Sequence, residues 1–345
     1  MLIITKIMQS QSIGNFAEVF NYLQNQIDGA YNIAILNGKG DFAAYRDKHG
    51  FRPLCYGVQD NILFVASEDS ALRPFTANIH PVQPGEMLTV SGDNPVVERE
   101  QIQNPEPAHC YLEWAYFANV ATTIDAIPVY LTRVKLGRGL ADIEDQKLDN
   151  DCVVIAIPES ARAAGKGFSD KLNLPVSEGI IKNIYSGRTF IEPPGTRSQK
   201  IEEKYLIIPE AIDGKRIFIV DDSLIRASTL KFLIQSLKKQ ASPREIHLRI
   251  AAPPVFAPCY YGIDIPTPKE LFAPQFMEQL LSGQLPQDIL EKMAQYFDVD
   301  SIRFLPVESM PKAIGIDTGK LCMACITGKY PTPAGTKNYS NTKNP

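Results

Sequence analysis

The sequence predicts an α/β protein in which a parallel-sheet domain follows a smaller α+β region. The first indication is that apolar runs alternate with helical segments between about 150 and 265, a pattern typical of parallel sheets. The second is that the runs at 152–157 and 216–220 are almost entirely apolar, as strands covered on both faces are. The third is the length of 345 residues, which suggests about two domains.

The composition excludes several classes of protein. Hydrophobic residues make up 44% of the chain and charged residues 21%, which excludes a mainly disordered protein. The net charge of −4 lacks the basic surplus of a nucleic-acid-binding protein, so no nucleic acid is expected as a partner. The apolar runs are too short for a membrane span, and the start lacks the apolar stretch of a signal peptide. We therefore expect a cytoplasmic protein without a membrane partner.

The first region, residues 1–104, is predicted to begin with a helix and to continue with short strands. Residues 14–27 place apolar side chains at helical spacing. The apolar runs 31–36 and 62–66 are bounded by turn residues, and glycines and prolines bracket a further strand at 86–90. Prolines in 103–107 disfavour both helix and central strand, so we expect a linker there, with 105–149 forming the linker and the start of the second domain.

The core of the second domain, residues 150–265, supplies three strand candidates and the best helix. The strands are expected at 152–157, 216–220 and 245–250, with an amphipathic helix at 228–240. Residues 266–332 are expected to form a C-terminal helical segment, helical mainly over 269–297. The polar stretch 333–345 shows no periodicity, and we expect it to be a flexible tail that frays.

Two adjacent acids end the second of these strands. Asp221 and Asp222 follow the apolar run, and a hydroxyl-rich loop then leads into the helix. Open α/β sheets bind ligands at the carboxyl ends of their strands, and a loop that enters a helix offers N–H groups to an anion. Ser228 and Thr229 would add hydroxyl donors, leaving the acids free for sugar hydroxyls and Mg²⁺. The alternative, that Asp222 or Ser223 caps the helix, explains one acid but not two.

Cys322 and Cys325 form a C-x2-C pair, a spacing that lets two thiolates bind one metal centre. Zinc, an iron–sulfur cluster, a redox pair and chance all stay open on this spacing alone. Cys55 and Cys152 lie in strand-like runs, where packing in the core is the expected role.

The stretch 217–230, IFIVDDSLIRASTL, resembles the ribose-phosphate-binding motif of type I phosphoribosyltransferases, in which two acids precede a short phosphate loop. The resemblance implies that the loop cradles a 5′-phosphate through Ser223, Arg226, Ala227, Ser228 and Thr229. Ala227 stands where that family has a glycine, which permits a positive φ and close approach of the phosphate.

A wider resemblance, to the amidophosphoribosyltransferases, covers nearly the whole chain. CYLEWAYFANVATTIDAIPVYLTRVKLGRGLA resembles the region that joins the two domains of that family. IPESARAAGKGFS, EGIIKNIYSGRTFI, VDDSLIRAST, RIAAPPVFAPCYYGIDIPT and CMACITGKYPT follow in the family's order. Upstream, GAYNIAIL, RDKHGFRPLCYG, ASEDSAL and VQPGEML resemble the later half of its glutaminase domain. The implied fold is a type I phosphoribosyltransferase domain preceded by a partial N-terminal-nucleophile-hydrolase-like sandwich.

This resemblance implies a reaction and its ligands. Ammonia would displace pyrophosphate from phosphoribosylpyrophosphate (PRPP), giving phosphoribosylamine in the first step of purine synthesis. Mg²⁺ would be held at Ser160, Asp221 and Asp222. The catalytic residues would be Lys182 and Arg188, which flank a loop that closes over substrate, although surface solvation is the usual role of single basic residues. The family's iron–sulfur branch binds a [4Fe–4S] cluster at positions matching Cys110, Cys259, Cys322 and Cys325. The family also suggests a homo-oligomer inhibited by purine nucleotides.

Some positions depart from the family pattern. Glu159 and Ala161 flank Ser160 in place of an aspartate and a glycine, and Ile184 stands where an arginine is common. Glu202 and Glu203 occupy positions that are often basic, and acids there would repel pyrophosphate. These departures favour a second hypothesis, a catalytically idle homologue that binds PRPP or purine nucleotides as a regulatory or structural subunit. A third, a nucleobase transferase of the same fold, is disfavoured by the cysteine set.

The N-terminal half of the glutaminase domain is expected to be missing. The family's nucleophile is a cysteine at the mature N-terminus, assisted by its own α-amino group, whereas no cysteine precedes Cys55 here. We therefore expect no glutamine hydrolysis by this chain alone, with ammonia as the nitrogen source. Half a sandwich would leave an apolar face and an edge exposed. An earlier true start, a separate glutaminase polypeptide and a covering oligomer partner are three open explanations.

Overall fold

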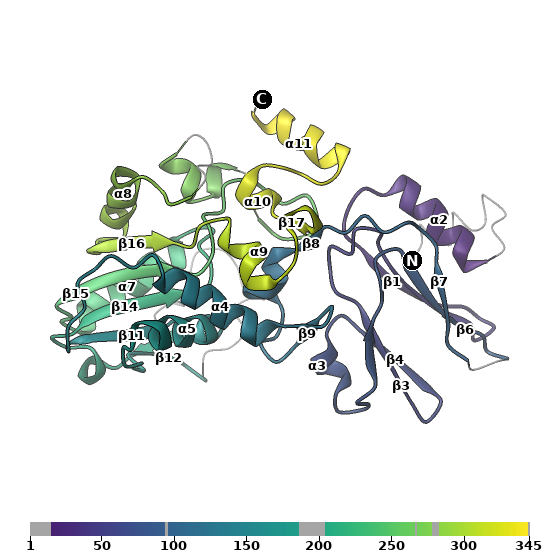
Figure 1. The fold of residues 1–345 in the computed structure, drawn as a ribbon, viewed down its shortest axis with the longest axis horizontal. Helices are drawn as coiled ribbons and strands as arrows, with labels where there is room; N and C mark the ends of the chain where they lie inside the picture. The colour runs from purple at the N-terminus through teal and green to yellow at the C-terminus, as the bar shows by residue number, and fades with distance from the viewer. Residues whose placement is uncertain (1–14, 94–95, 186–203, 266–267, 278–282, 344–345) are drawn as a thin grey trace.

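The computed structural model describes residues 15–93, 96–185, 204–265, 268–277 and 283–343. Two domains lie side by side in it, the N-terminal one to the right in Figure 1 and the parallel-sheet domain to the left. Arg188, Glu202 and Glu203 lie outside the described residues. In the described part of the chain, no helix is both long and apolar enough to span a bilayer.

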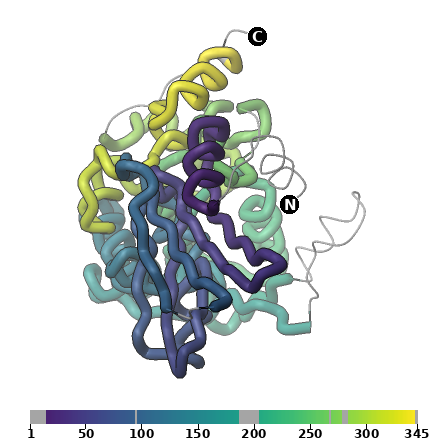
Figure 2. The backbone as a smooth tube through the Cα atoms, turned by 90° about the vertical axis from the view of Figure 1, so that its right-hand side faces the viewer, coloured from purple at the N-terminus to yellow at the C-terminus, as the bar shows by residue number. Residues whose placement is uncertain are grey.

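The N-terminal domain is a sandwich of two antiparallel sheets, with a helix on the outer face of one sheet (Figure 2). The spatial orders are β1–β2–β6–β7 and β4–β3–β5. The elements are α2 Phe16–Gln26, β1 Asn32–Leu36, β2 Phe42–Arg46, β3 Cys55–Gln59, β4 Ile62–Ala66, α3 Asp69–Leu72, β5 Ile79–Pro81, β6 Glu86–Val90 and β7 Glu98–Gln101. These bounds confirm the predicted helix and the three predicted strands of this region.

Local chemistry and packing explain these elements. The side chain of Asn15 accepts a hydrogen bond from Glu18 N at 2.8 Å and so caps the start of α2. Phe20 of this helix stacks on Tyr45 of β2, with ring centroids 4.8 Å apart. A second small core, which includes Ala44 and Leu88, fills the space between the sheets.

In the described part of the chain, strands β1 and β4 each lie at the end of a sheet. A cavity of about 510 Å³ opens between them and is lined by apolar side chains such as Ile33, Leu63 and Val65. Leu36 and Ile62 are exposed beside it.

The second domain is built on a four-stranded parallel sheet in the order β11–β14–β15–β16, as the sequence predicts for its first three strands. Alternate residues of β14 enter opposite cores: Phe218 packs in the core with α4 and α5, whereas Ile219 packs in the core with α7 and α8. Both faces of the sheet are therefore covered, which explains the apolar strands. The elements are α4 Val129–Ala141, β11 Cys152–Ala156, α5 Arg162–Leu172, β14 Arg216–Asp221, α7 Ser228–Gln240, β15 Glu245–Ile250, α8 Gln287–Phe297 and β16 Ser301–Phe304.

Shorter elements surround this sheet and join the domains. They are β8 His109–Cys110, the π-helical turn η1 Glu113–Phe117, β9 Thr123–Ile124, β10 Ile127–Pro128, β12 Ile180–Lys182, β13 Tyr205–Ile207, η3 Pro209–Ala211, η4 Pro268–Glu270, η5 Ala273–Gln275, α9 Ser309–Ile314, η6 Thr318–Lys320, β17 Leu321–Cys322, α10 Ala324–Thr327 and α11 Pro333–Lys343.

Two expectations for the C-terminal part are wrong. Residues 266–332 are not simply helical, because β16 completes the parallel sheet and most of 268–277 forms short 3₁₀ turns. The fraying tail is instead the helix α11, which starts with Pro333, a residue whose fixed φ suits the first helical position. Tyr339 of this helix packs on Tyr330, with ring centroids 5.1 Å apart.

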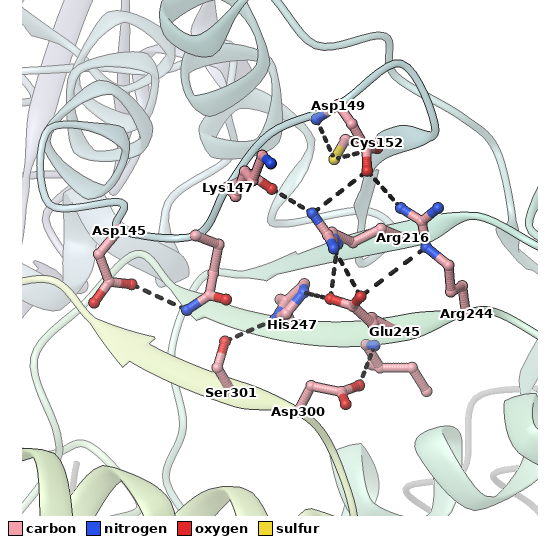
Figure 3. A network of polar contacts seen from close by, with 12 residues as sticks. Asp145, Lys147, Asp149, Cys152, Arg216, Arg244, Glu245, His247, Asp300 and Ser301 are labelled. Atoms are coloured by element: carbon pink, nitrogen blue, oxygen red, sulfur yellow. Dashed lines mark hydrogen bonds and ion pairs between the residues drawn. The ribbon is translucent and has the colours of Figure 1, made fainter.

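A network of charged and polar side chains covers the edge of the sheet where its strands begin, called the amino edge here (Figure 3). Arg216 Nε lies 2.7 Å from Glu245 Oε2, and Arg244 Nη2 lies 2.6 Å from Asp149 Oδ2. His247 Nδ1 contacts Ser301 Oγ at 2.8 Å. The amino edge thus holds its charges in pairs.

Candidate active site

The predicted acid pair lies at the opposite, carboxyl edge of the sheet. Asp221 is the last residue of β14, an inner strand that pairs with both β11 and β15. Its carbonyl oxygen accepts a hydrogen bond from Ala251 N at 2.8 Å, which ties it to the end of the neighbouring strand. Asp222 follows directly and is only 5% exposed. Both acids therefore occupy the place where open α/β sheets bind ligands.

A hydrogen bond brings Ser223 to this pair. The Ser223 hydroxyl donates to Asp222 Oδ1 at 2.7 Å, and the N–H of Asp222 donates to Asp221 Oδ1 at 2.9 Å. Ser160 lies on the loop after β11, and its hydroxyl lowers the pKa of Asp222. Its predicted role beside the two acids stays a prediction.

The two carboxylates have no cationic partner at ion-pair distance among the described residues. Desolvation raises the pKa of Asp221 well above its usual range, and the charge of Asp222 raises it further. Burial also raises the pKa of Asp222, although hydrogen bonds from Ser160 and Ser223 oppose this effect. Two neighbouring acids that are costly to ionise would be stabilised by a cation or by hydroxyl donors.

The loop from Ser223 to Ala227 leads from the acid pair into helix α7. Helix α7 begins at Ser228, and no side chain caps it, so the hypothesis that Asp222 or Ser223 is the helix cap is wrong. Ala227 immediately precedes the helix with φ +60°, in the left-handed region that favours glycine. An alanine there costs roughly 1–2 kcal/mol. The side chains of Ser228 and Thr229 are exposed in the first turn, where helix N–H groups lack intrahelical partners.

The other predicted basic residues are less closely connected to the acids. Arg226 is exposed, and its Nη2 lies 3.5 Å from Asp264 Oδ2. Lys182 ends β12 on the surface, and among the described residues no hydrogen bond or ion pair joins it to the acid pair. Lys204 lies nearer, since its charge lowers the pKa of Asp221.

Three further side chains that were not predicted interact electrostatically with the acids. Desolvation, and then the charges of the two acids, raise the pKa of Tyr116 and of Tyr205, so both phenols lie close to the acid pair. Arg133, buried in α4, has its pKa lowered by burial and raised by the charge of Asp222. Tyr116 and Arg133 both lie in the quoted stretch that joins the domains, but spacing alone does not point them toward a strand end elsewhere in the chain.

The four cysteines of the proposed cluster lie near one another in the structure. Strand β8 pairs in parallel with β17, which places Cys110 opposite Cys322. Phe256 N and Ala257 N donate to the carbonyl oxygen of Cys325 at 2.8 and 2.9 Å, which brings the loop of Cys259 to α10. Cys55 and Cys152 are instead buried in strands β3 and β11, which confirms their predicted place in the core.

The chemistry of this cysteine set suits a soft metal centre. Burial raises the pKa of the Cys322 thiol to about 12, and it also raises the pKa of Cys110 and Cys325. Such thiols ionise only beside a strong positive charge. An all-sulfur donor set favours zinc or iron–sulfur chemistry over Mg²⁺ or Ca²⁺. Within the described ranges, no three His, Cys, Asp or Glu side chains are arranged to bind one single ion.

Comparison with known proteins places these features in a family. A family profile described as a glutamine amidotransferase domain matches residues 5–74. The chain is 42% identical over 315 residues to the amidophosphoribosyltransferase of Pyrococcus horikoshii and 37% identical over 320 residues to that of Methanocaldococcus jannaschii. These matches cover 91% and 88% of this chain but 65% and 64% of the relatives. The chain thus spans slightly less than two thirds of the length of these curated relatives.

Solved structures agree with the sequence matches. The glutamine PRPP amidotransferase from B. subtilis, complexed with ADP and GMP, aligns with a TM-score of 0.82 at 31% identity, covering 96% of this chain and 70% of that one. A structure described as the allosteric regulatory enzyme of purine biosynthesis aligns with a TM-score of 0.77 at 30% identity, covering 96% and 73%. The predicted α/β fold is confirmed, and the chain belongs to the amidophosphoribosyltransferase family.

Proposed function

We propose that the chain transfers ammonia to PRPP, releasing pyrophosphate and forming phosphoribosylamine for purine biosynthesis. The observation that carries this proposal is the pair Asp221 and Asp222, held side by side without a salt bridge among the described residues and followed by an uncapped helix start. Relatives at 37–42% identity are amidophosphoribosyltransferases by name. Membership of a glycosyltransferase-type family and the geometry of the site thus support the same reaction.

Recognition of the 5′-phosphate would fall to the loop before α7. The hydroxyls of Ser228 and Thr229 are exposed, and the first N–H groups of the helix face an anion with the positive end of the helix dipole. The positive φ of Ala227 turns the chain sharply into the helix. This arrangement supplies hydrogen-bond donors but no general base, which suits a phosphate that is bound and does not react.

The acids would hold the ribose hydroxyls and Mg²⁺. The carboxylates of Asp221 and Asp222 and the hydroxyl of Ser160 are hard oxygen donors, which suit Mg²⁺, and substrate phosphates commonly complete its coordination. When bound, Mg²⁺ neutralises charge on the leaving pyrophosphate. Because both acids are desolvated, they interact strongly with any cation or hydroxyl placed beside them.

In the reaction, the bond between C1 of the ribose and pyrophosphate breaks as the nitrogen of ammonia bonds to C1, and the nitrogen then loses a proton. Positive charge builds on the sugar, and carboxylates nearby favour it. Lys182 and Arg188 would flank the loop that closes over the substrate and excludes water, which otherwise competes with ammonia.

The source of ammonia is part of the proposal. We expect free ammonia to serve this chain alone, and a separate glutaminase subunit to supply it where one is present. The apolar cavity between β1 and β4 supports a partner that would cover it. A homo-oligomer, inhibition by purine nucleotides and a cytoplasmic location are further expectations, and the nucleotides bound to the B. subtilis protein support the second.

A [4Fe–4S] cluster is proposed at Cys110, Cys259, Cys322 and Cys325. Each thiolate of such a cluster binds a different iron, so its ligands need not converge on one ion. The cluster would be structural, because its ligands come from the linker, the transferase domain and the C-terminal part. Anaerobically purified protein should be brown, and Cys322→Ser should lose the colour whereas Cys55→Ser keeps it. Cys259→Ser should lower thermal stability. A colourless protein that contains zinc would contradict the cluster.

One observation favours the second candidate, a catalytically idle homologue that binds PRPP or purine nucleotides. Ala227 adopts its left-handed conformation at a cost that glycine would avoid, and its methyl group adds bulk within the loop. A regulatory or structural subunit can function with weaker phosphate binding than an enzyme requires.

One assay separates the candidates. Anaerobically purified protein is incubated with PRPP and Mg²⁺, with either ammonium or glutamine, and pyrophosphate release is measured. The proposal predicts release with ammonium and none above background with glutamine. Binding of PRPP without pyrophosphate release, measured by calorimetry, would favour the idle homologue. The absence of both would contradict the enzyme and leave only a homologue that binds purine nucleotides.

A further inference from the structure

Tyr111 is a buried tyrosine whose hydroxyl lies beside one of the proposed cluster ligands. The residue follows Cys110 of β8 directly and is fully buried in the larger core of the second domain. Its Oη lies 3.7 Å from Sγ of Cys325, on α10. In the described part of the chain, this is the only hydrogen bond of the hydroxyl. A hydroxyl in an apolar core is costly without a partner, so the cysteine sulfur is what satisfies this group.

The protonation of Cys325 decides which of the two groups donates this hydrogen bond. As a thiol, Cys325 can donate its proton to the oxygen of Tyr111. A thiolate that binds iron has no proton, so the hydroxyl must then donate to the sulfur. Hydrogen bonds to a charged acceptor are stronger than those between neutral groups. Binding of a cluster would therefore strengthen this contact and make Tyr111 the donor.

A second buried tyrosine near the cysteines has its hydroxyl beside a different group. The backbone N–H of Tyr261 donates to Sγ of Cys259 at 3.3 Å. Its hydroxyl lies instead 3.0 Å from Oγ1 of Thr332. Removing the hydroxyl of Tyr261 would thus leave both hydrogen bonds to cysteine sulfur in place. Tyr261→Phe is therefore a matched control for Tyr111→Phe, because both replace a buried tyrosine of the same part of the fold.

We propose that the Tyr111 hydroxyl donates a hydrogen bond to the Cys325 ligand of the cluster and thereby raises the reduction potential of the cluster. This inference rests on the [4Fe–4S] cluster of the proposed function. Hydrogen bonds to the sulfur ligands are among the factors that set such potentials. Reduction adds one electron, so the sulfurs carry more negative charge in the reduced form and attract the donor more strongly. The hydroxyl therefore stabilises the reduced form more than the oxidised form.

The test is a potentiometric titration of anaerobically purified protein, in which an electrode supplies the electron. Tyr111→Phe removes the hydroxyl and keeps the ring that packs in the core. It should lower the potential by a shift that corresponds to about a threefold to tenfold smaller equilibrium constant for reduction, where tenfold is 59 mV for one electron. Charge-transfer absorbance from thiolate to iron should also move to longer wavelength, because a thiolate without this donor gives up electron density more readily. Tyr261→Phe should change neither property.

A second variant, with 3-fluorotyrosine at position 111, has the opposite expected sign and serves also if Tyr111→Phe does not fold. Its hydroxyl is more acidic and hence a stronger donor, so the potential should rise. An unchanged potential in either variant at position 111, or an equal shift in Tyr261→Phe, would overturn the inference. A native chain without iron and sulfide would overturn the cluster and this inference with it. Pyrophosphate release enters none of these measurements, so failure of the proposed reaction stays distinguishable.

Discussion

The carboxylates at the two edges of the parallel sheet have pKa shifts of opposite sign. At the amino edge, Arg216 pairs with Glu245 at 2.7 Å, and the hydrogen bond from Arg216 lowers the pKa of that carboxyl. Burial alone would raise the pKa of Asp149, yet hydrogen bonds from Cys152 and Arg244 lower it. At the carboxyl edge, Asp221 and Asp222 lack a salt bridge to any described residue, and desolvation raises the pKa of each.

The paired carboxylates of the amino edge stabilise the fold, whereas the carboxylates at the carboxyl edge remain available to a ligand. The carboxylates of the amino edge pair with arginines of the same chain, so they need no cation from solution. The carboxyl edge keeps two acids at an energetic cost that a bound cation or sugar would relieve. Substitutions at the two edges should therefore have opposite consequences for stability and activity.

The largest expected effect is on activity at the carboxyl edge. Asp221→Asn combined with Asp222→Asn should reduce ammonium-dependent pyrophosphate release by roughly a thousandfold or more, because the cation and ribose ligands are lost. The fold should persist, since no salt bridge to a described residue is broken. Asp149→Asn at the amino edge is the control and should retain the activity. Global unfolding of the double variant, seen by circular dichroism, would assign the acids a structural role instead.

The largest expected effect on stability lies in the network that begins at the amino edge. Ser301 contacts both His247 and Arg249, and Arg249 Nε lies 2.5 Å from Glu144 Oε2 with both side chains buried. Arg249→Met should lower the free energy of unfolding by about 3–5 kcal/mol, because it leaves a buried carboxylate unpaired. Urea denaturation measures this loss. KM for PRPP should stay within about twofold in the folded variant.

A matched substitution tests whether burial is the cause. Lys238→Met breaks the exposed pair with Asp298, which should cost less than about 1 kcal/mol. Equal losses for Arg249→Met and Lys238→Met would contradict the distinction between buried and exposed pairs.

Mg²⁺ should stabilise the protein by binding at the carboxyl edge and not at the amino edge. At a hundredfold excess over its Kd, a ligand that binds only the folded state adds about 2.7 kcal/mol. Mg²⁺ with PRPP should therefore raise the thermal unfolding temperature of the native chain by an amount consistent with that energy. The variant Asp221→Asn/Asp222→Asn should show no increase, whereas Asp149→Asn should respond like the native chain. A full response in the double variant would place the cation elsewhere.

The smallest expected effects are changes of stability with pH, which should have opposite signs at the two edges. Asp222 has a raised pKa in the folded state, so the native chain loses stability as pH rises above the unfolded pKa of an aspartate. Asp222→Asn should thus be more stable than the native chain at pH 8, and the difference should shrink on acidification. Glu245 has a lowered pKa, so its contribution is present at neutral pH and is lost as pH falls through its folded pKa. Glu245→Gln should be less stable at pH 7, with the difference vanishing in acid. Parallel pH profiles for the two variants would contradict the comparison.

The sequence predicts the acid pair at a strand end and three of the four strands of the parallel sheet, because an apolar run that ends in two acids is a local signal. Strand β15 and helix α7 have the predicted bounds, since β-branched or amphipathic periodicity determines both. Helices α4 and α5 were not predicted, because glycines within them disfavour helix. The structure explains these glycines: a Cβ on Gly137 would lie 1.9 Å from Ala164 O, and one on Gly167 would lie 2.0 Å from Val134 O. The two helices can pack so closely only at glycine.

The rest of the site depends on tertiary structure. Tyr116 lies in a π-helical turn, which has no sequence signature of its own, and Arg133 of α4 donates a hydrogen bond to its carbonyl oxygen. Tyr205 lies in the short strand β13, which pairs with the earlier strand β12, and the charges of the two acids act on its phenol. The spacing of the C-x2-C pair does not identify the other ligands of a metal centre. The parallel pairing of β8 with β17 places Cys110 beside this pair.

Calorimetric titration of PRPP into the native chain, with and without Mg²⁺, tests the central claim most directly. The carboxyl-edge acids should make binding dependent on Mg²⁺, and Asp221→Asn/Asp222→Asn should abolish the heat signal while Asp149→Asn keeps it. Equal binding by the double variant, or binding that is unaffected by Mg²⁺, would contradict the assignment of this edge as the phosphoribosyl site.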